Sequence, residues 1–177
     1  MASRYIMVDI EADGPIPGPY SMISLGAVVV QPPPQRTFYQ TFYPISDQWI
    51  PQALAVSGMT REDTMKGTPP KIAILNFQTW LLSVTNKPKF ISDNNGFDWQ
   101  FVNWYFWTYS RGNPFGHSST NLESLYKGLV TNLKLNFKHL RKTKHMHNPV
   151  DDAMGNVEAL LELDRQFNLN IIRGSHR

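Results

Sequence analysis

The stretch RYIMVDIE, residues 4–11, is the strongest indication of the fold in this chain. It is a nearly continuous run of β-favouring residues, which is typical of a strand buried on both faces of a sheet. Asp9 and Glu11 stand two positions apart near its end, so their side chains project from the same face of the strand. The segment therefore predicts a buried strand that ends in a pair of carboxylates.

The residues that follow alternate between loops, strands and helices. Residues 12–19 contain three prolines and two glycines, which predicts a loop. The strands predicted at residues 22–30 and 36–43 are separated only by QPPPQ, so we expect an antiparallel hairpin. Residues 133–141 fit no single pattern. The other expected elements are helices at residues 51–56, 70–84, 97–109 and 121–129, a strand at residues 89–92, and a last helix that starts at Pro149 with Asn148 as its N-cap.

This order of elements indicates an α/β fold with a mixed sheet flanked by helices. The length of 177 residues suits one domain, which we expect over residues 1–172. Residues 173–177 are expected to be an unstructured tail or a cloning remnant. The hydrophobic and charged fractions, 41% and 18%, are typical of a globular protein and argue against intrinsic disorder.

The composition excludes several functional classes. The chain has no cysteine, which rules out disulfides, thiolate metal sites and a cysteine nucleophile. Any metal must therefore be held by Asp, Glu, His or backbone oxygen. No apolar run is long enough to span a membrane, and the N-terminus lacks the features of a signal peptide. We expect a cytoplasmic protein with no membrane partner.

The net charge of +3 is small, but the charges are unevenly distributed. Residues 127–150 contain six lysines and arginines, three histidines and no acid, whereas several acids stand in short clusters elsewhere. A basic segment beside an acidic pocket suits a metal-dependent enzyme that acts on a polyanion. Lys142 and Lys144 in this segment are candidates for contact with a phosphate backbone, and a solvated surface is the alternative.

Four acids and one histidine are the candidates for chemistry. Two ionised carboxylates on a buried strand repel each other and lose solvation, which costs roughly several kcal/mol unless a cation such as Mg²⁺ or Mn²⁺ compensates. A solvated strand end is the alternative for Asp9 and Glu11. Asp98 and Asp152 each also fit the first turn of a helix, where the helix dipole favours an acid. His147 alone fits an exposed surface position.

Three segments together are similar to the exonuclease motifs of the DEDDh family, which contains proofreading 3′→5′ exonucleases, ribonuclease T and oligoribonuclease. They are MVDIE at residues 7–11, NGFDW at residues 95–99 and HNPVDDA at residues 147–153. ISLGAV at residues 23–28 and AVSGMT at residues 55–60 also resemble family segments and stand in the expected order. The resemblance implies a ribonuclease-H-like fold with a central mixed sheet of about five strands.

The resemblance also implies a mechanism and a substrate. Asp9, Glu11, Asp98 and Asp152 would hold two divalent ions, Mg²⁺ or Mn²⁺, and His147 would take the proton of the attacking water. The substrate would be single-stranded nucleic acid, degraded from its 3′ end to nucleoside 5′-monophosphates. Because relatives that stand alone are often dimers, a homodimer is a further hypothesis.

The residues beside the motifs leave alternatives open. Phe97 and Trp99 flank Asp98, and they either pack in the core or stack on the terminal base of the substrate. Asp151 suits helix capping, whereas the four-residue gap after His147 favours Asp152 as the residue of the site. Asp13 departs from the family pattern, and it either stays in its loop or influences the site from outside.

Two other functions are compatible with these acids. One is a ribonuclease-H-like endonuclease, which would release internal fragments in place of single nucleotides. The other is a nucleic-acid-binding module without catalysis. The sequence does not distinguish RNA from DNA, because that choice depends on the shape of the pocket around the 2′ position.

Overall fold

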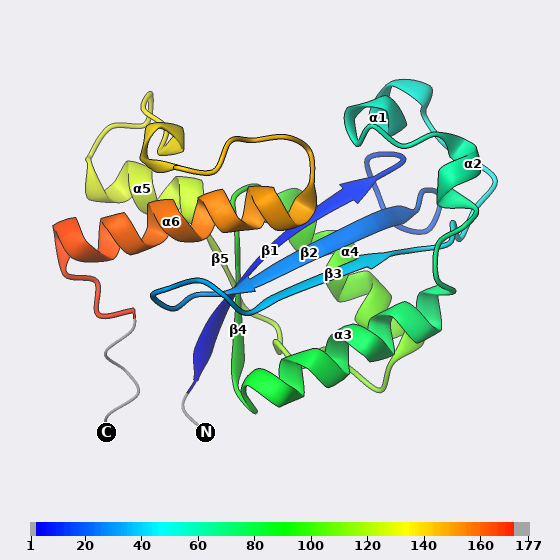
Figure 1. Cartoon of the computed structure of the whole chain (residues 1–177), viewed down its shortest axis with the longest axis horizontal. Coiled ribbons are helices and arrows are strands. Elements are labelled where there is room, and N and C mark those ends of the chain that lie inside the picture. Colours follow the sequence, from blue (N-terminus) through cyan, green and yellow to red (C-terminus); the bar gives the residue numbers. More distant parts are fainter. Residues whose placement is uncertain (1–2, 172–177) are drawn as a thin grey trace.

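The computed structural model describes residues 3–171, and five strands form one mixed sheet in the order β3-β2-β1-β4-β5 (Figure 1). The elements along the chain are β1 (Arg4–Ala12), β2 (Met22–Val29), β3 (Thr37–Thr41), α1 (Pro51–Val56), α2 (Arg61–Thr64), α3 (Pro70–Val84), β4 (Pro88–Ser92), α4 (Asn95–Tyr109), β5 (Ser119–Asn121), α5 (Leu122–Leu129), the 3₁₀ helix η1 (Lys138–Leu140) and α6 (Pro149–Phe167). β1 to β3 are antiparallel neighbours, whereas β1, β4 and β5 run parallel. The expected five-stranded mixed α/β sheet is thus confirmed.

The central strand β1 separates two apolar layers. Ile6, Val8 and Ile10 belong to the buried cluster that includes α3 and α4. Met7 belongs to the other cluster, which includes α5 and α6. Because side chains alternate along a strand, Asp9 and Glu11 project from the same face as Met7, toward α6. The apolar sequence of β1 thereby holds a pair of acids at the edge of a buried layer.

The last helix lies across this face of the sheet, where it is orange to red in Figure 1. Asn148 caps it, since its side-chain oxygen accepts hydrogen bonds from the backbone N–H groups two and three residues later. Gly26 in β2 makes the close approach possible: a Cβ there would lie 2.2 Å from the carbonyl carbon of Pro149. Gly26 pairs with Asp9, so the first turn of α6 lies beside the acids of β1.

The structure confirms the predicted strands and helices and adds two elements. The predicted strand at residues 36–43 is shorter, and the undecided residues 133–141 form only η1. β5 has the polar sequence Ser-Thr-Asn, so it carries none of the apolar signal that identifies a strand. α2 starts at a capping box of Thr60 and Asp63, and these residue types at this spacing are a local signal for a helix start.

The tail expected at residues 173–177, like residue 172, lies outside the described residues. Over residues 3–171, the structure has no helix with the length and apolar character needed to cross a membrane.

Candidate active site

Carboxylates from three elements converge at the C-terminal end of β1. Oxygen atoms of Asp9, Glu11 and Asp152 lie within 4.8 Å of one another. The first two come from one face of β1, and Asp152 comes from the first turn of α6, which Gly26 allows onto the sheet. Residues 143 positions apart in the chain thus supply one group of oxygen ligands.

Asp98 reaches the same place from the first turn of α4. β4 pairs with β1 only as far as Met7, so the end of β1 extends beyond its parallel neighbour. There the Ile10 N–H donates a hydrogen bond of 3.3 Å to Oδ1 of Asp98. The other oxygen, Oδ2, is buried without a hydrogen-bond partner. We call Asp9, Glu11, Asp98 and Asp152 the acidic cluster.

Asp152 shows the same division between its two oxygens. Its Oδ1 accepts a hydrogen bond of 3.1 Å from the Met146 N–H and lies 2.7 Å from Nδ1 of His145. Its Oδ2 is buried and unpartnered. A buried polar atom without a partner is rare in native proteins and requires an explanation. In this cluster two acids each keep one oxygen free.

The electrostatics of the acidic cluster favour a cation. Burial is the largest cause that raises the pKa of Asp9 well above its ordinary value, and the carboxylates of Asp98, Asp152 and Glu11 raise it further. Burial, with a contribution from Asp152, raises the pKa of Glu11 to about 7. Burial raises the pKa of Asp98 to about 8. These groups resist ionisation together, and a divalent ion with oxygen ligands relieves that cost. The residues present therefore fit a hard divalent metal.

His147 lies at the edge of the acidic cluster, on the loop of residues 141–148 that we call the histidine loop. Its Nδ1 is 3.8 Å from Oε1 of Glu11, and its side chain is 44% exposed. The histidine loop is anchored upstream, where Glu158 of α6 accepts hydrogen bonds from the N–H groups of Lys142 and Thr143. The His147 side chain is therefore open to solvent and faces the Glu11 carboxylate.

The comparison with known families identifies this arrangement. A family model described as Exonuclease, RNase_T, matches residues 6–160. The chain belongs to this exonuclease family. A curated relative, the 3′-5′ DNA exonuclease Cap18 of Escherichia coli, is 39% identical over 129 residues, which are 71% of this chain and 68% of the relative. The chain is thus a 3′→5′ exonuclease of the DEDDh type, as the three motifs predict.

Solved structures share the exonuclease fold. The zinc-ion-bound form of the E. coli exonuclease I complex with single-stranded DNA matches with a TM-score of 0.76 and 16% identity, over 96% of this chain and 42% of that chain. The 3′-exonuclease in a structure of 3′-end-specific recognition of a histone mRNA stem-loop matches with a TM-score of 0.73 and 14% identity, over 93% and 83%. The chain spans less than half the length of exonuclease I. At these identities the likeness shows the ribonuclease-H-like fold alone.

The aromatic residues that flank Asp98 pack mainly inside the exonuclease fold. Phe97 and Trp99 are partly buried and contact the apolar cluster around α3 and α4. The Trp99 ring meets the Phe90 ring edge-on with centroids 5.0 Å apart, and Phe97 lies 5.2 Å from Phe101. Trp99 also lines a cavity of about 550 Å³ with residues 111–114 and 116–117, away from the acidic cluster.

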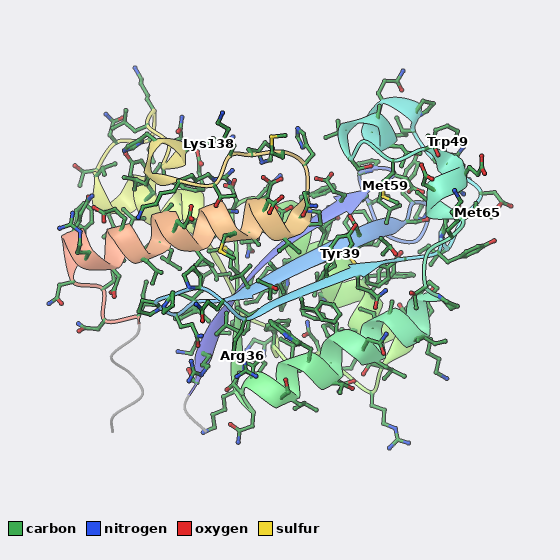
Figure 2. All side chains as sticks on the ribbon, in the orientation of Figure 1. Arg36, Tyr39, Trp49, Met59, Met65 and Lys138 are labelled. Carbon is green, nitrogen blue, oxygen red and sulfur yellow. The ribbon has the colours of Figure 1, made fainter. Side chains whose placement is uncertain are left out.

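The two lysines of the histidine loop lie at different places. Lys142 lines a cavity of about 520 Å³ with Glu158 and Glu162 of α6, and none of the acidic cluster lines that cavity. Lys144 is exposed and directly precedes His145. Figure 2 shows Lys138 on one side of the N-terminal end of α6, and Met59 and Trp49 on the other side.

Two residues that interact with the acids, one by contact and one through its charge, are not predicted by the sequence. His145 contacts Asp152, and the only hint was its position two residues before the motif histidine. Asp93, at the end of β4, contributes to the raised pKa values of Asp9 and Asp98 and pairs with Arg141 at 3.0 Å. This ion pair joins residues 48 positions apart, and no periodic pattern predicts such a pair.

Proposed function

We propose that this exonuclease removes nucleoside 5′-monophosphates from the 3′ end of single-stranded DNA with two divalent ions, Mg²⁺ or Mn²⁺. The observation that carries the proposal is the convergence of four acids, two of which keep a buried oxygen free, beside an exposed histidine. A single divalent ion would compensate only half of the four negative charges, whereas two ions would match them.

The acidic cluster would hold the ions. Asp9, Glu11 and Asp152 offer oxygens within 4.8 Å of one another, and Asp98 would add its free Oδ2 from the first turn of α4. When bound, the ions supply an acidified water and stabilise the charge that develops on the phosphate and the leaving oxygen. The carboxylates keep those charges in fixed positions, because β1 and two helix N-termini hold them.

His147 would act as the general base. Its Nδ1 faces Glu11 at 3.8 Å, which leaves Nε2 as the ring nitrogen that takes the proton. The Glu11 carboxylate then stabilises the imidazolium that forms. The loop position suits this role, because the side chain can reach solvent and return the proton after each cycle.

DNA is proposed as the substrate because the curated relative is named as a DNA exonuclease. A single strand is favoured because a duplex end would have to fray before its terminal phosphate reached the acids. Phe97, Trp99, Lys142 and Lys144 remain proposed substrate contacts, with base stacking for the aromatics and phosphate contact for the lysines.

The test is a product gel with separately labelled ends. DNA and RNA oligonucleotides of one sequence, single- and double-stranded, are labelled at either the 3′ or the 5′ end and incubated with MgCl₂ or MnCl₂. We expect the 3′ label to leave at once as a mononucleotide, while the 5′ label shortens one nucleotide at a time, with single-stranded DNA fastest. Internal fragments in the first samples would indicate an endonuclease, and faster loss of RNA would overturn the DNA preference.

A homodimer and a cytoplasmic location stay predictions. Equilibrium sedimentation checks the first, and a single species at the monomer mass of 20.3 kDa would refute it.

A further inference from the structure

A second group of metal-binding side chains adjoins the acidic cluster. His145, His147 and Asp152 each offer one ligand atom, and these atoms lie within 4.8 Å of one another. The two imidazole rings meet edge-on with centroids 4.3 Å apart. Met146 between them is 67% exposed. We call these three residues the imidazole group.

The imidazole group and the acidic cluster differ in ligand chemistry and share one residue. The acidic cluster offers only carboxylate oxygens, which suit hard ions such as Mg²⁺. The imidazole group offers two nitrogens and one oxygen, a set that favours Zn²⁺ and similar transition-metal ions. Asp152 belongs to both. Its Oδ1 faces His145 at 2.7 Å and offers the oxygen to the imidazole group, while its buried Oδ2 has no partner.

We propose that His145, His147 and Asp152 form an inhibitory site for a transition-metal ion of the Zn²⁺ class. The proposal rests on the proposed function, because an ion bound there withdraws the general base and one carboxylate ligand from hydrolysis. Zinc and the pair of hard ions then compete for Asp152. The exonuclease would consequently be active with Mg²⁺ or Mn²⁺ and be switched off by low concentrations of zinc.

The geometry allows this site with small movements. Ligand atoms around a tetrahedral zinc ion lie about 3.3 Å apart, given bonds of about 2.0–2.1 Å. The 2.7 Å contact between Nδ1 of His145 and Oδ1 of Asp152 must therefore open slightly. The ligand atoms of the group that lie farther apart, within 4.8 Å, must come closer together. Both histidine side chains are close to half exposed, on a loop whose anchors at Glu158 and Asn148 lie outside the group. The fourth position is left to water or to Glu11.

The alternative is that His145 only orients Asp152 through a hydrogen bond. In that case a glutamine at this position, which can also donate a hydrogen bond, would substitute for it, and loss of His145 would not change zinc affinity. The two explanations differ in what the histidine binds, so a binding measurement separates them without reference to catalysis.

The first experiment measures binding to the full chain. Co²⁺ is used as the visible probe, because its absorption reports nitrogen ligands and low coordination number, and Zn²⁺ is then titrated to displace it. We expect one equivalent with the absorption of nitrogen-ligated, low-coordinate Co²⁺ in the wild type and in Asp98→Asn, which disrupts the acidic cluster alone. Binding should weaken at least tenfold in His145→Gln and in His147→Gln. His139→Gln, an exposed histidine outside the group, is the matched control and should bind as the wild type does.

The second experiment measures zinc inhibition of hydrolysis at saturating Mg²⁺. The concentration for half inhibition should rise at least tenfold in His145→Gln, and it should stay unchanged in His139→Gln. Co²⁺ or Zn²⁺ affinity that is equal in the wild type and His145→Gln would overturn the site. If the chain hydrolyses no nucleic acid under any condition, the proposed function fails, while the binding experiment still decides whether the imidazole group holds a metal.

Discussion

Two regions of this molecule bury carboxylates, and they treat them in opposite ways. In the loop after β1, Asp13 is fully buried with both oxygens occupied: Oδ1 accepts a hydrogen bond of 2.6 Å from the Ser21 N–H, and Oδ2 pairs with Arg61 at 3.0 Å. In the acidic cluster, Asp98 and Asp152 are equally buried, yet each keeps one oxygen without a partner.

The difference distinguishes Asp13, whose partners all belong to the protein, from Asp98 and Asp152, which each keep an oxygen available for a ligand. Removing one partner from a buried, fully paired carboxylate costs stability, whereas a buried carboxylate with a free oxygen already costs stability unless something binds. Asp13 joins its loop to α2 through Arg61, which also donates to the Ser46 carbonyl. The acid that departs from the family pattern is therefore structural. The four predictions below test this separation.

The largest effect is expected for Asp98→Asn. The amide keeps an oxygen for the Ile10 N–H, so the fold should persist, but the site loses a charged metal ligand. If the metals contribute about 4 kcal/mol less to the transition state, kcat falls about 10³-fold. Initial rates on 3′-labelled DNA measure the loss, and circular dichroism checks that the variant is folded. Activity within tenfold of the wild type would remove Asp98 from the proposed site.

Asp13→Asn should lower stability and leave activity largely unchanged, whereas Asp98→Asn should lower activity and leave the fold intact. Removing one partner of a buried ion pair costs about 3–5 kcal/mol, and we expect about 3 kcal/mol here because Arg61 is 21% exposed. The free energy of unfolding, measured with urea, should fall by that amount. Activity of the folded fraction at low temperature should stay within a few-fold of the wild type.

The control for Asp13 is a double-mutant cycle with Arg61→Met. If the two side chains act as a pair, the second substitution adds little to the first. Additive losses would mean that Asp13 and Arg61 stabilise the loop separately.

The contrast between the two regions also shows what the sequence could predict. The motif acids and His147 could be predicted from the sequence, because each stands at a strand end or helix start that local patterns define. The partner of Asp13 could not be predicted from the sequence, because Arg61 is 48 residues away and the contact depends on how two loops fold together. The same reason hides Gly26, whose role appears only once α6 packs on β2.

β5 marks a second limit of sequence reasoning. Its three residues are polar and pair with β4 at the edge of the sheet, so backbone hydrogen bonds define it and side-chain pattern does not. His145 marks a third. Its contact with Asp152 requires the turn of the histidine loop at His147, where φ is 55°, and the sequence alone does not show that turn.

The free energy of unfolding is also expected to depend on pH in the absence of metal. The pKa values of Glu11 and Asp98 are raised to about 7 and about 8, so the folded protein holds protons that the unfolded chain releases. This contribution to stability is complete below the ordinary carboxyl pKa and is lost as the pH rises through 7 to 8. In EDTA, the free energy of unfolding should fall by up to about 6 kcal/mol between pH 5 and pH 8.

Two additions make the pH experiment specific to the acidic cluster. Saturating MgCl₂ should reduce the fall, because a bound cation stabilises the ionised carboxylates, and Asp98→Asn should reduce it without metal. A stability that rises from pH 5 to pH 8 in EDTA would contradict the raised pKa values.

The smallest effect is expected for Asp151→Asn, which sharpens the comparison within one turn of α6. Asp151 is exposed, whereas Asp152 is buried with its free oxygen in the acidic cluster. The exposed acid contributes only through the helix dipole, about 0.3–1 kcal/mol, so the melting temperature should fall by about 1–3 °C while the rate of hydrolysis stays unchanged. Asp152→Asn should instead abolish hydrolysis. Exchange of these two outcomes would show that the register of the third motif is wrong by one residue, and the metal ligand would then be the acid that the structure leaves in solvent.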